Sequence, residues 1–323
     1  MRDGREREGR MKPIIVCGLA VLALAGTGVL QARAGGRAPP PPANSRGAPA
    51  LEELRRATYQ GIEEAGDPVT LSGGQWAGPP AVKGSAVAPS VVLVGHFRLT
   101  GDLEGDRTEE AVVLLAGSAG GSGENLYLAV VGRRKGRPWN VATALLGDRV
   151  QVRDAQVNAR RIIVDVLQAG PNDAMCCPGE LATRRWTLES GRLKEAPARV
   201  TGRLSPEAMG GVEWVLREWY RGEAAPAEPE VTLRLDAGNL AGSAGCNRYF
   251  APVKAGSTPG ALSVGMAGST RMMCPETEMS VETRFLRQLA GVDRMRFTPG
   301  RLGLGYERDG RRGIMLFERR AKP

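Results

Sequence analysis

Three carboxylates near residue 100 have the spacing of the first calcium ligands in a calcium-binding loop. Asp102, Glu104 and Asp106 would fill its first, third and fifth positions. Such a loop also needs glycine at the sixth position and a bidentate carboxylate at the twelfth. Arg107 and Val113 stand at those two positions instead. The pattern therefore offers part of a calcium site, and an acidic turn before a strand is the other reading.

The same carboxylates could serve a hydrolase. Asp102, Asp106, Asp148 and Asp173 could converge in space as a general acid and a general base, although their spacing does not require it. Nucleophilic catalysis by serine or cysteine needs a positioned base, and the chain has a single histidine, His96. We therefore expect a non-enzymatic protein, with a hydrolase-like or calcium-stabilised middle region as the alternative.

The sequence indicates neither a nucleotide cofactor nor a nucleic-acid partner. The Gly/Ser-rich residues 117–123 lack the Lys-Ser/Thr pair of a phosphate-binding loop. The net charge is +9, but the basic residues are scattered among acidic ones, and the densest run is residues 133–135. Nucleic-acid binders instead cluster basic and aromatic residues on one surface. We expect no cofactor and no nucleic acid.

The N-terminus is typical of an export signal. Basic residues precede an uncharged apolar run at 14–30, and Ala-Arg-Ala at 32–34 matches the small-x-small pattern of signal peptidase sites. We therefore interpret residues 1–34 as a signal peptide and predict a periplasmic or secreted protein. A retained anchor is the alternative, because the run reaches the lower length limit for a span. Contact with a membrane is expected only if the segment is not cleaved.

A mostly β fold with few helices (α+β) is predicted, divided into two domains. Residues 35–50 are rich in Pro and Ala and are expected to be a disordered linker. Residues 51–196 form a predicted antiparallel β-rich domain, which begins with a short amphipathic helix at 51–65. Its expected strands lie at 91–99, 111–116, 125–131, 140–146, 148–152, 161–167 and 184–188. The run at 111–116 is apolar throughout, which predicts burial on both faces.

A linker at 196–205 would lead to a second domain at 206–323. Residues 231–235 alternate between apolar and polar, as a half-buried strand does. Val281, Phe285 and Leu289 recur at helical spacing, which predicts one packed helix. The remaining expected strands lie at 261–266, 295–297, 301–306 and 313–318.

Two motifs give this second domain a family resemblance. Residues 245–249 read Gly-Cys-Asn-Arg-Tyr, and residues 270–274 read Thr-Arg-Met-Met-Cys. Together with the helix near 285–289, they resemble the META domain of HslJ-like bacterial envelope proteins over about residues 208–319. The resemblance implies a compact β domain with one packed helix, in proteins linked to heat shock, stress tolerance and motility. It implies no known catalytic residues.

The middle region resembles uncharacterised domains that accompany META domains. The residues that carry this likeness are 101–106, 120–123, 146–150 and 173–178. The likeness implies an accessory domain of the cell envelope and no particular chemistry.

The cysteines are expected to have structural roles. Once residues 1–34 are removed four remain, and an even number in an exported protein allows two disulfides. We favour a Cys246–Cys274 pair because both residues lie in the C-terminal domain. Cys176 and Cys177 could form a vicinal disulfide, half of a metal site or a redox pair; zinc would need two more ligands.

A binding role is the leading functional hypothesis. Asn247, Arg248, Thr270 and Arg271 flank the two motif cysteines and are the candidate contacts for a small ligand or an envelope partner. The other reading of the motifs is a pair of turns held together by a disulfide. The sequence thus predicts an exported, stress-related binding module.

Overall fold

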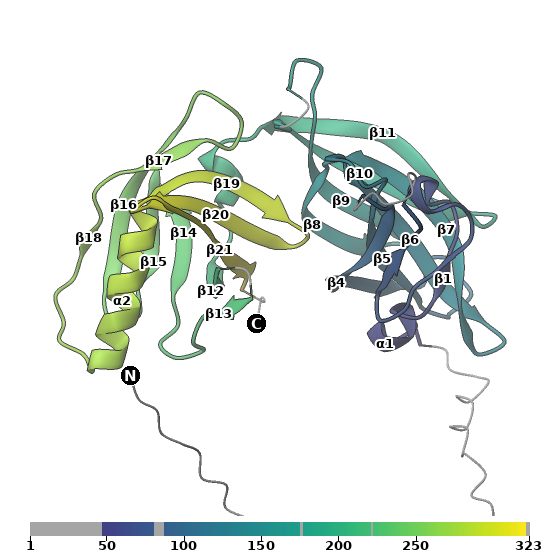
Figure 1. Ribbon diagram of the computed structural model, residues 1–323, viewed down its shortest axis with the longest axis horizontal. Helices are drawn as coiled ribbons and strands as arrows, with labels where there is room; N and C mark the ends of the chain where they lie inside the picture. Colours follow the sequence, from purple (N-terminus) through teal and green to yellow (C-terminus); the bar gives the residue numbers. More distant parts are fainter. Residues whose placement is uncertain (1–46, 81–86, 175–176, 221, 321–323) are drawn as a thin grey trace, which may run out of the picture. The chain divides into compact units, whose positions relative to one another are not determined.

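The computed structural model describes residues 47–80, 87–174, 177–220 and 222–320. Within these residues the chain is mostly antiparallel β-structure with two α-helices, which confirms the predicted fold class (Figure 1). No helix among the described residues is long and apolar enough to cross a membrane. The signal peptide and most of the Pro/Ala-rich linker lie outside them and stay predictions.

Two large antiparallel sheets make up most of the middle region, and β1 and β2 form a small third one. The first has the order β3-β4-β5-β6-β7 and the second the order β11-β10-β9-β8. Their strands are β3 (Gln75–Ala77), β4 (Ser90–Gly101), β5 (Glu110–Ser118), β6 (Asn125–Arg134), β7 (Arg137–Asp148), β8 (Gln151–Asn158), β9 (Arg161–Gln168), β10 (Glu180–Glu189) and β11 (Arg192–Arg203).

The central strand β5 is buried on both faces, as its unbroken apolar run predicts. Val112 and Leu114 point to a core shared with β9 and β10, which includes Trp186. Val113 and Leu115 point to the opposite face and pack with the residues that precede the sheet. Two separate apolar cores therefore lie on the two sides of one strand.

The helix predicted for residues 51–65 is wrong beyond its first turn. Helix α1 covers only Leu51–Leu54 and is followed by β1 (Thr58–Tyr59), the 3-10 turn η1 (Glu63–Ala65) and β2 (Val69–Thr70). Gly61 has φ +75°, which a continuing helix does not allow. The Tyr59 hydroxyl donates to the Leu54 carbonyl at 2.9 Å in the core, so tertiary packing overrides the helical spacing.

Two further boundaries differ from the prediction. The strand expected at 148–152 does not exist as one element, because β7 ends at Asp148 and β8 begins at Gln151. The linker expected at 196–205 is mostly strand: β11 pairs with β10 as far as Arg203. A 3-10 turn, η2 (Pro206–Met209), then leads into the second region.

The C-terminal region is a single curved sheet with one long helix. Its strand order is β17-β16-β15-β14-β12-β21-β20-β19, with β13 beside β12 and β18 beside β16. The elements are β12 (Trp214–Tyr220), β13 (Glu223–Ala224), β14 (Thr232–Asp236), β15 (Asn239–Ser243), β16 (Arg248–Ala255), β17 (Leu262–Val264), β18 (Gly268–Ser269), α2 (Glu276–Leu289), β19 (Val292–Thr298), β20 (Arg301–Arg308) and β21 (Arg311–Arg319).

The two ends of this sheet meet. The Met295 amide on β19 donates to the Gly260 carbonyl beside β17 at 2.7 Å, and Ala261 bridges to Arg294. This contact covers part of the exposed edge at both ends of the sheet.

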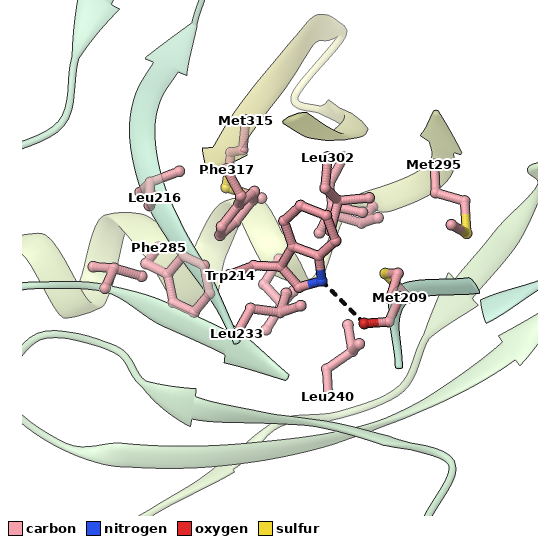
Figure 2. Packing of buried hydrophobic residues seen from close by; sticks show 14 of the residues in the cluster. Met209, Trp214, Leu216, Leu233, Leu240, Phe285, Met295, Leu302, Met315 and Phe317 are labelled. Atoms are coloured by element: carbon pink, nitrogen blue, oxygen red, sulfur yellow. Dashed lines mark hydrogen bonds between the residues drawn. The ribbon is translucent and has the colours of Figure 1, made fainter. Parts of the chain in front are cut away.

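The core enclosed by the curved sheet is aromatic and methionine-rich. Trp214 is fully buried and donates its indole N–H to the Met209 carbonyl at 3.0 Å, as Figure 2 shows. Phe285 of α2 packs edge-on against Tyr249 of β16, with ring centroids 5.1 Å apart. Helix α2 is therefore fixed to the sheet by its inward face, and its outward face is left free to form a surface.

Candidate functional site

A disulfide joins the two sequence motifs. Cys246 precedes β16 and Cys274 precedes α2, and their Cα atoms lie 5.9 Å apart. This is the pairing that the sequence analysis favours. Cys176 lies outside the described residues, so the expectation for Cys176 and Cys177 stays a prediction.

Asn247 connects the same two motifs through hydrogen bonds. Its side-chain oxygen accepts from the Thr270 hydroxyl at 2.8 Å and from the Met272 amide at 2.7 Å. Its side-chain nitrogen donates to the Met272 carbonyl at 3.2 Å and to Glu282 Oε2 at 3.0 Å. The Asn247 amide also donates to Glu282 Oε2 at 2.9 Å. Both side chains are buried, so this network fastens the loop to α2.

This burial corrects the prediction that Asn247 contacts a ligand. It is only 3% exposed, and its side chain is fully engaged inside the domain. Arg248, Thr270 and Arg271 are exposed around it, although the Thr270 hydroxyl is already bound to Asn247. Of the four candidates, the two arginines are therefore the ones whose side chains lie at the surface without a bound partner among the described residues.

The carboxylates of the calcium hypothesis hold their own turn. Asp102 accepts from the backbone amides of Asp106 and Arg107 at 3.2 and 3.0 Å. Asp106 accepts from the Thr108 amide and hydroxyl at 2.8 and 2.6 Å. Glu104 lies in the same turn and is exposed. Local hydrogen bonds thus occupy the Asp102 and Asp106 carboxylates, and calcium binding at this turn stays a prediction.

The other two aspartates of the hydrolase hypothesis also stabilise loops. Asp148 accepts from the Glu124 amide at 3.0 Å and pairs with Arg149 at 2.6 Å. Asp173 accepts from the amides of Gly170 and Gly179, both at 2.8 Å, and forms an ion pair with Arg203. The hydrogen bond from the Arg203 guanidinium, with those two amides, lowers the pKa of Asp173 to about 2.

Acidic groups do approach one another near Asp148. It lines a hollow of about 240 Å³ with Glu64 and Glu124. Glu64 is occupied there, because it accepts from the Tyr127 hydroxyl at 2.7 Å and from the Asn125 amide group at 2.5 Å. The structure does not bring the four aspartates of the hydrolase hypothesis into this hollow.

Among the described residues, one cluster brings potential metal ligands together. Three donor atoms from His, Cys, Asp or Glu lie within 4.8 Å of one another in that part of the chain only at Cys246, Cys274 and Glu278. The two sulfurs are joined in the disulfide, so they do not act there as thiolate ligands.

A larger hollow lies along the outward face of α2. Its volume is about 850 Å³, and one wall is α2 while the other is the turn between β20 and β21. The α2 residues recur at helical spacing on the face opposite Phe285 and Leu289. The hollow is lined by Glu276, Met279, Ser280, Thr283, Arg284, Arg287, Gln288, Tyr306, Arg308, Asp309 and Arg311.

Basic groups dominate the charge of this α2 hollow, with four arginines against Glu276 and Asp309. Arg284 is fixed by two hydrogen bonds to Glu223 at 2.6 and 2.8 Å and lies 4.6 Å from the centre of the Trp219 ring. Arg287 pairs with Asp309. Arg311 takes part in none of the ion pairs among the described residues, so its charge is available to a ligand.

Gln288 and Tyr306 bring polar groups to the hollow, and only some of these groups have hydrogen-bond partners among the described residues. The Gln288 side-chain nitrogen donates to the Tyr306 hydroxyl at 2.9 Å, while Gln288 Oε1 is buried and has no hydrogen-bond partner among the described residues. Burial raises the pKa of Tyr306, which keeps its phenol protonated at neutral pH. The hollow therefore offers one free acceptor beside a neutral hydroxyl.

The sequence analysis did not find this hollow. The feature of the sequence that could have indicated it is the set of arginines on α2 and on both sides of the Asp309-Gly310 turn. What the sequence does not show is that the turn at the end of β20 lies beside the outward face of the helix.

Comparison with known proteins gives one family match. Residues 207–320 match the META domain. A search of the curated proteins found no match. The NMR structure of a protein from Burkholderia xenovorans is similar at 26% identity, covering 39% of this chain and 96% of that chain, with a TM-score of 0.30. The C-terminal third of this chain is therefore a META domain, as its Gly-Cys-Asn and Met-Met-Cys motifs indicate.

Proposed function

We propose that the protein is a non-enzymatic binding module whose META domain holds a small anionic ligand in the α2 hollow. The observation that carries this proposal is the surplus of arginines around a hollow of about 850 Å³. Guanidinium groups bind carboxylate and phosphate groups in a two-pronged geometry. The Met279 and Tyr306 side chains add apolar surface for the rest of such a ligand.

The lining of the hollow supports binding in preference to catalysis. Arginine does not lose its proton in proteins, so it cannot serve as a general base. The raised pKa of Tyr306 keeps its phenol protonated at neutral pH, so it is not available as a base. Asp309 is held by Arg287. The remaining acid, Glu276, lies in the first turn of α2. The lining hydroxyls of Ser280 and Thr283 donate to backbone carbonyls of the helix, both at 2.8 Å, and not to Glu276.

Arg311 and Gln288 have complementary parts in the proposed site. The unpaired Arg311 guanidinium would bind the anionic group. The free Gln288 Oε1 would accept from a hydroxyl, amine or amide of the same molecule. The proposed ligand is therefore a small acid that also carries a hydrogen-bond donor.

We place this module outside the cytoplasm, in the periplasm or beyond the cell. The N-terminal pattern of basic and apolar residues supports this placement, and so does a disulfide in the META domain, because disulfides persist in oxidising compartments. A role in stress tolerance rests on the resemblance alone. Intact mass of the protein isolated from cells, measured before and after reduction, tests both the cleavage after residue 34 and the disulfide.

Backbone-amide chemical shifts test the ligand proposal. Titration with inorganic phosphate, and then with citrate as a larger polyanion, is expected to shift the amides of residues 284–288 and 306–311. Arg311→Gln removes the available charge and should weaken binding about tenfold, from the loss of one charge-assisted hydrogen bond worth about 1.5 kcal/mol.

The matched control is Arg192→Gln, since Arg192 is an exposed arginine on β11 and far from α2 in sequence. It should leave the titration unchanged. Shifts spread evenly over exposed basic residues, with equal effects from the two substitutions, would refute a specific site.

A further inference from the structure

Four large apolar side chains are exposed on one part of the META domain. Met266 and Met273 are 93% and 98% exposed, and Phe250 and Met272 are 59% and 58% exposed. Exposed apolar residues are ordinary when they are scattered, but a contiguous group marks an interaction surface.

These side chains follow one another along the edge of the sheet. The segment after β17 runs antiparallel to β16: the Gly265 amide donates to the Pro252 carbonyl at 2.8 Å, and Gly268 pairs with Phe250. Farther along, the Thr270 amide donates to the Arg248 carbonyl at 3.0 Å. In this register the segment passes Phe250 of β16 on its way from Met266 to Met272 and Met273.

The segment is firmly attached to the domain behind it. Along β16 the residues alternate between exposed and buried, and Tyr249, Ala251 and Val253 point into the core. The Met272 amide is bound to the buried Asn247, and the disulfide of Cys274 follows two residues later. The apolar side chains are therefore held outward by a fixed backbone.

The charge around this surface is mainly basic. Glu276 and Glu278 follow it at the start of α2, and Glu278 lies beside the disulfide. From residue 237 to residue 275 the chain contains no Asp or Glu, but it contains Arg248, Lys254 and Arg271. All three are exposed, and none takes part in the ion pairs found among the described residues. A partner that complements this surface must combine negative charge with an apolar interior.

We propose that Phe250, Met266, Met272 and Met273, which we name the apolar strip, dock the META domain on an anionic lipid bilayer. The three basic residues would lie at the level of the headgroups. A bilayer suits this surface better than a protein does, because insertion of separate protruding side chains needs no matching pocket. None of the four side chains lines the α2 hollow, so this surface is separate from the proposed ligand site.

Vesicle sedimentation tests the proposal. The full chain is mixed with vesicles of phosphatidylcholine alone or with phosphatidylglycerol added, at low salt. We expect binding to the anionic vesicles that weakens as salt rises. Met272→Ser/Met273→Ser should reduce the partition coefficient at least tenfold, since burial of these side chains is lost. Arg248→Gln/Lys254→Gln/Arg271→Gln should reduce it by about fivefold per residue.

Two controls keep the experiment decisive. Val200→Ser removes an apolar side chain of similar exposure, 56%, on β11 and should have no effect. A tryptophan placed by Met273→Trp should show a blue-shifted emission with anionic vesicles. All variants keep the same N-terminal segment, so its contribution cancels.

Wild-type protein that fails to bind anionic vesicles overturns the proposal, as does binding that the strip variants do not change. If the strip variants instead alter the sedimentation coefficient of the protein alone, the strip is an interface between copies of the chain, and the lipid proposal is wrong. Phosphate titration of the strip variants should match wild type, which separates this result from the test of the α2 hollow.

Discussion

Asn247→Ala should loosen the joint between the two META motifs. The substitution removes a weak side-chain hydrogen bond to Cys246 Sγ and four stronger ones, to Thr270, Glu282 and both backbone groups of Met272. A net contribution of about 1 kcal/mol for each bond predicts a loss of about 3–4 kcal/mol. The Met272 amide and the buried Glu282 carboxylate would also each lose a partner, which adds to the cost.

Hydrogen–deuterium exchange measured on peptides of the full chain is the suitable assay, because it reports this region apart from the middle sheets. Peptides covering residues 265–275 and the first half of α2 should exchange faster in the variant. Peptides from β5 and β6 should exchange as in wild type.

Asn239→Ala is the matched control. Asn239 makes one exposed hydrogen bond, to the Ala237 carbonyl at 3.2 Å, and its loss should cost less than about 0.5 kcal/mol. An opening free energy for residues 265–275 that falls by less than about 1 kcal/mol in Asn247→Ala would refute the network as the main fastening of this loop.

Three further outcomes follow from the structure. Replacing both Cys246 and Cys274 by alanine should lower the free energy of unfolding by about 3–4 kcal/mol, since the disulfide closes a loop of 28 residues. A urea titration measures this, and an unchanged midpoint would contradict it. The lowered pKa of Asp173 gives stability that is present above its unfolded pKa of about 3.9 and is lost as the pH falls toward about 2. Asp173→Asn should therefore flatten the acid side of a plot of melting temperature against pH. An unchanged plot would disprove the link. Gly242→Ala would press its new methyl group against the Thr232 carbonyl oxygen and should lower the melting temperature. The new methyl group of Gly238→Ala meets open space and is strained only by the φ of +77°, so this variant should lower the melting temperature less. The reverse order would show that the strand moves freely.

Most strands were predictable because their burial follows from local sequence. The apolar run in β5 and the alternation in β14 reflect which faces are buried, and the Gly-rich turns separate the elements. The helix expected at 51–65 failed for a non-local reason. Its apolar residues Leu54, Tyr59 and Ile62 pack against the first sheet as a chain of short turns, and their spacing alone does not show that contact.

The site was less predictable than the fold, because side-chain roles depend on what lies across from them. Asn247 and Arg248 are neighbours, yet one is 3% exposed and the other is at the surface. Strand alternation separates them, and the sequence alone left the phase of that alternation open. The α2 hollow was harder still to predict from the sequence, since its two walls come from a helix and from a turn about twenty residues away.

The two motifs form one attachment between β16 and α2, and other side chains of the same motifs cover it on the outside. Cys246 and Asn247 point inward and fix the first motif to α2, while Met272 contributes its backbone and Cys274 its sulfur to the same attachment. The side chains that these anchors leave outside are apolar or basic. An attachment that served stability alone would gain nothing from exposing two methionines, because their burial would be favourable. Their exposure is what makes a second role for this surface worth testing.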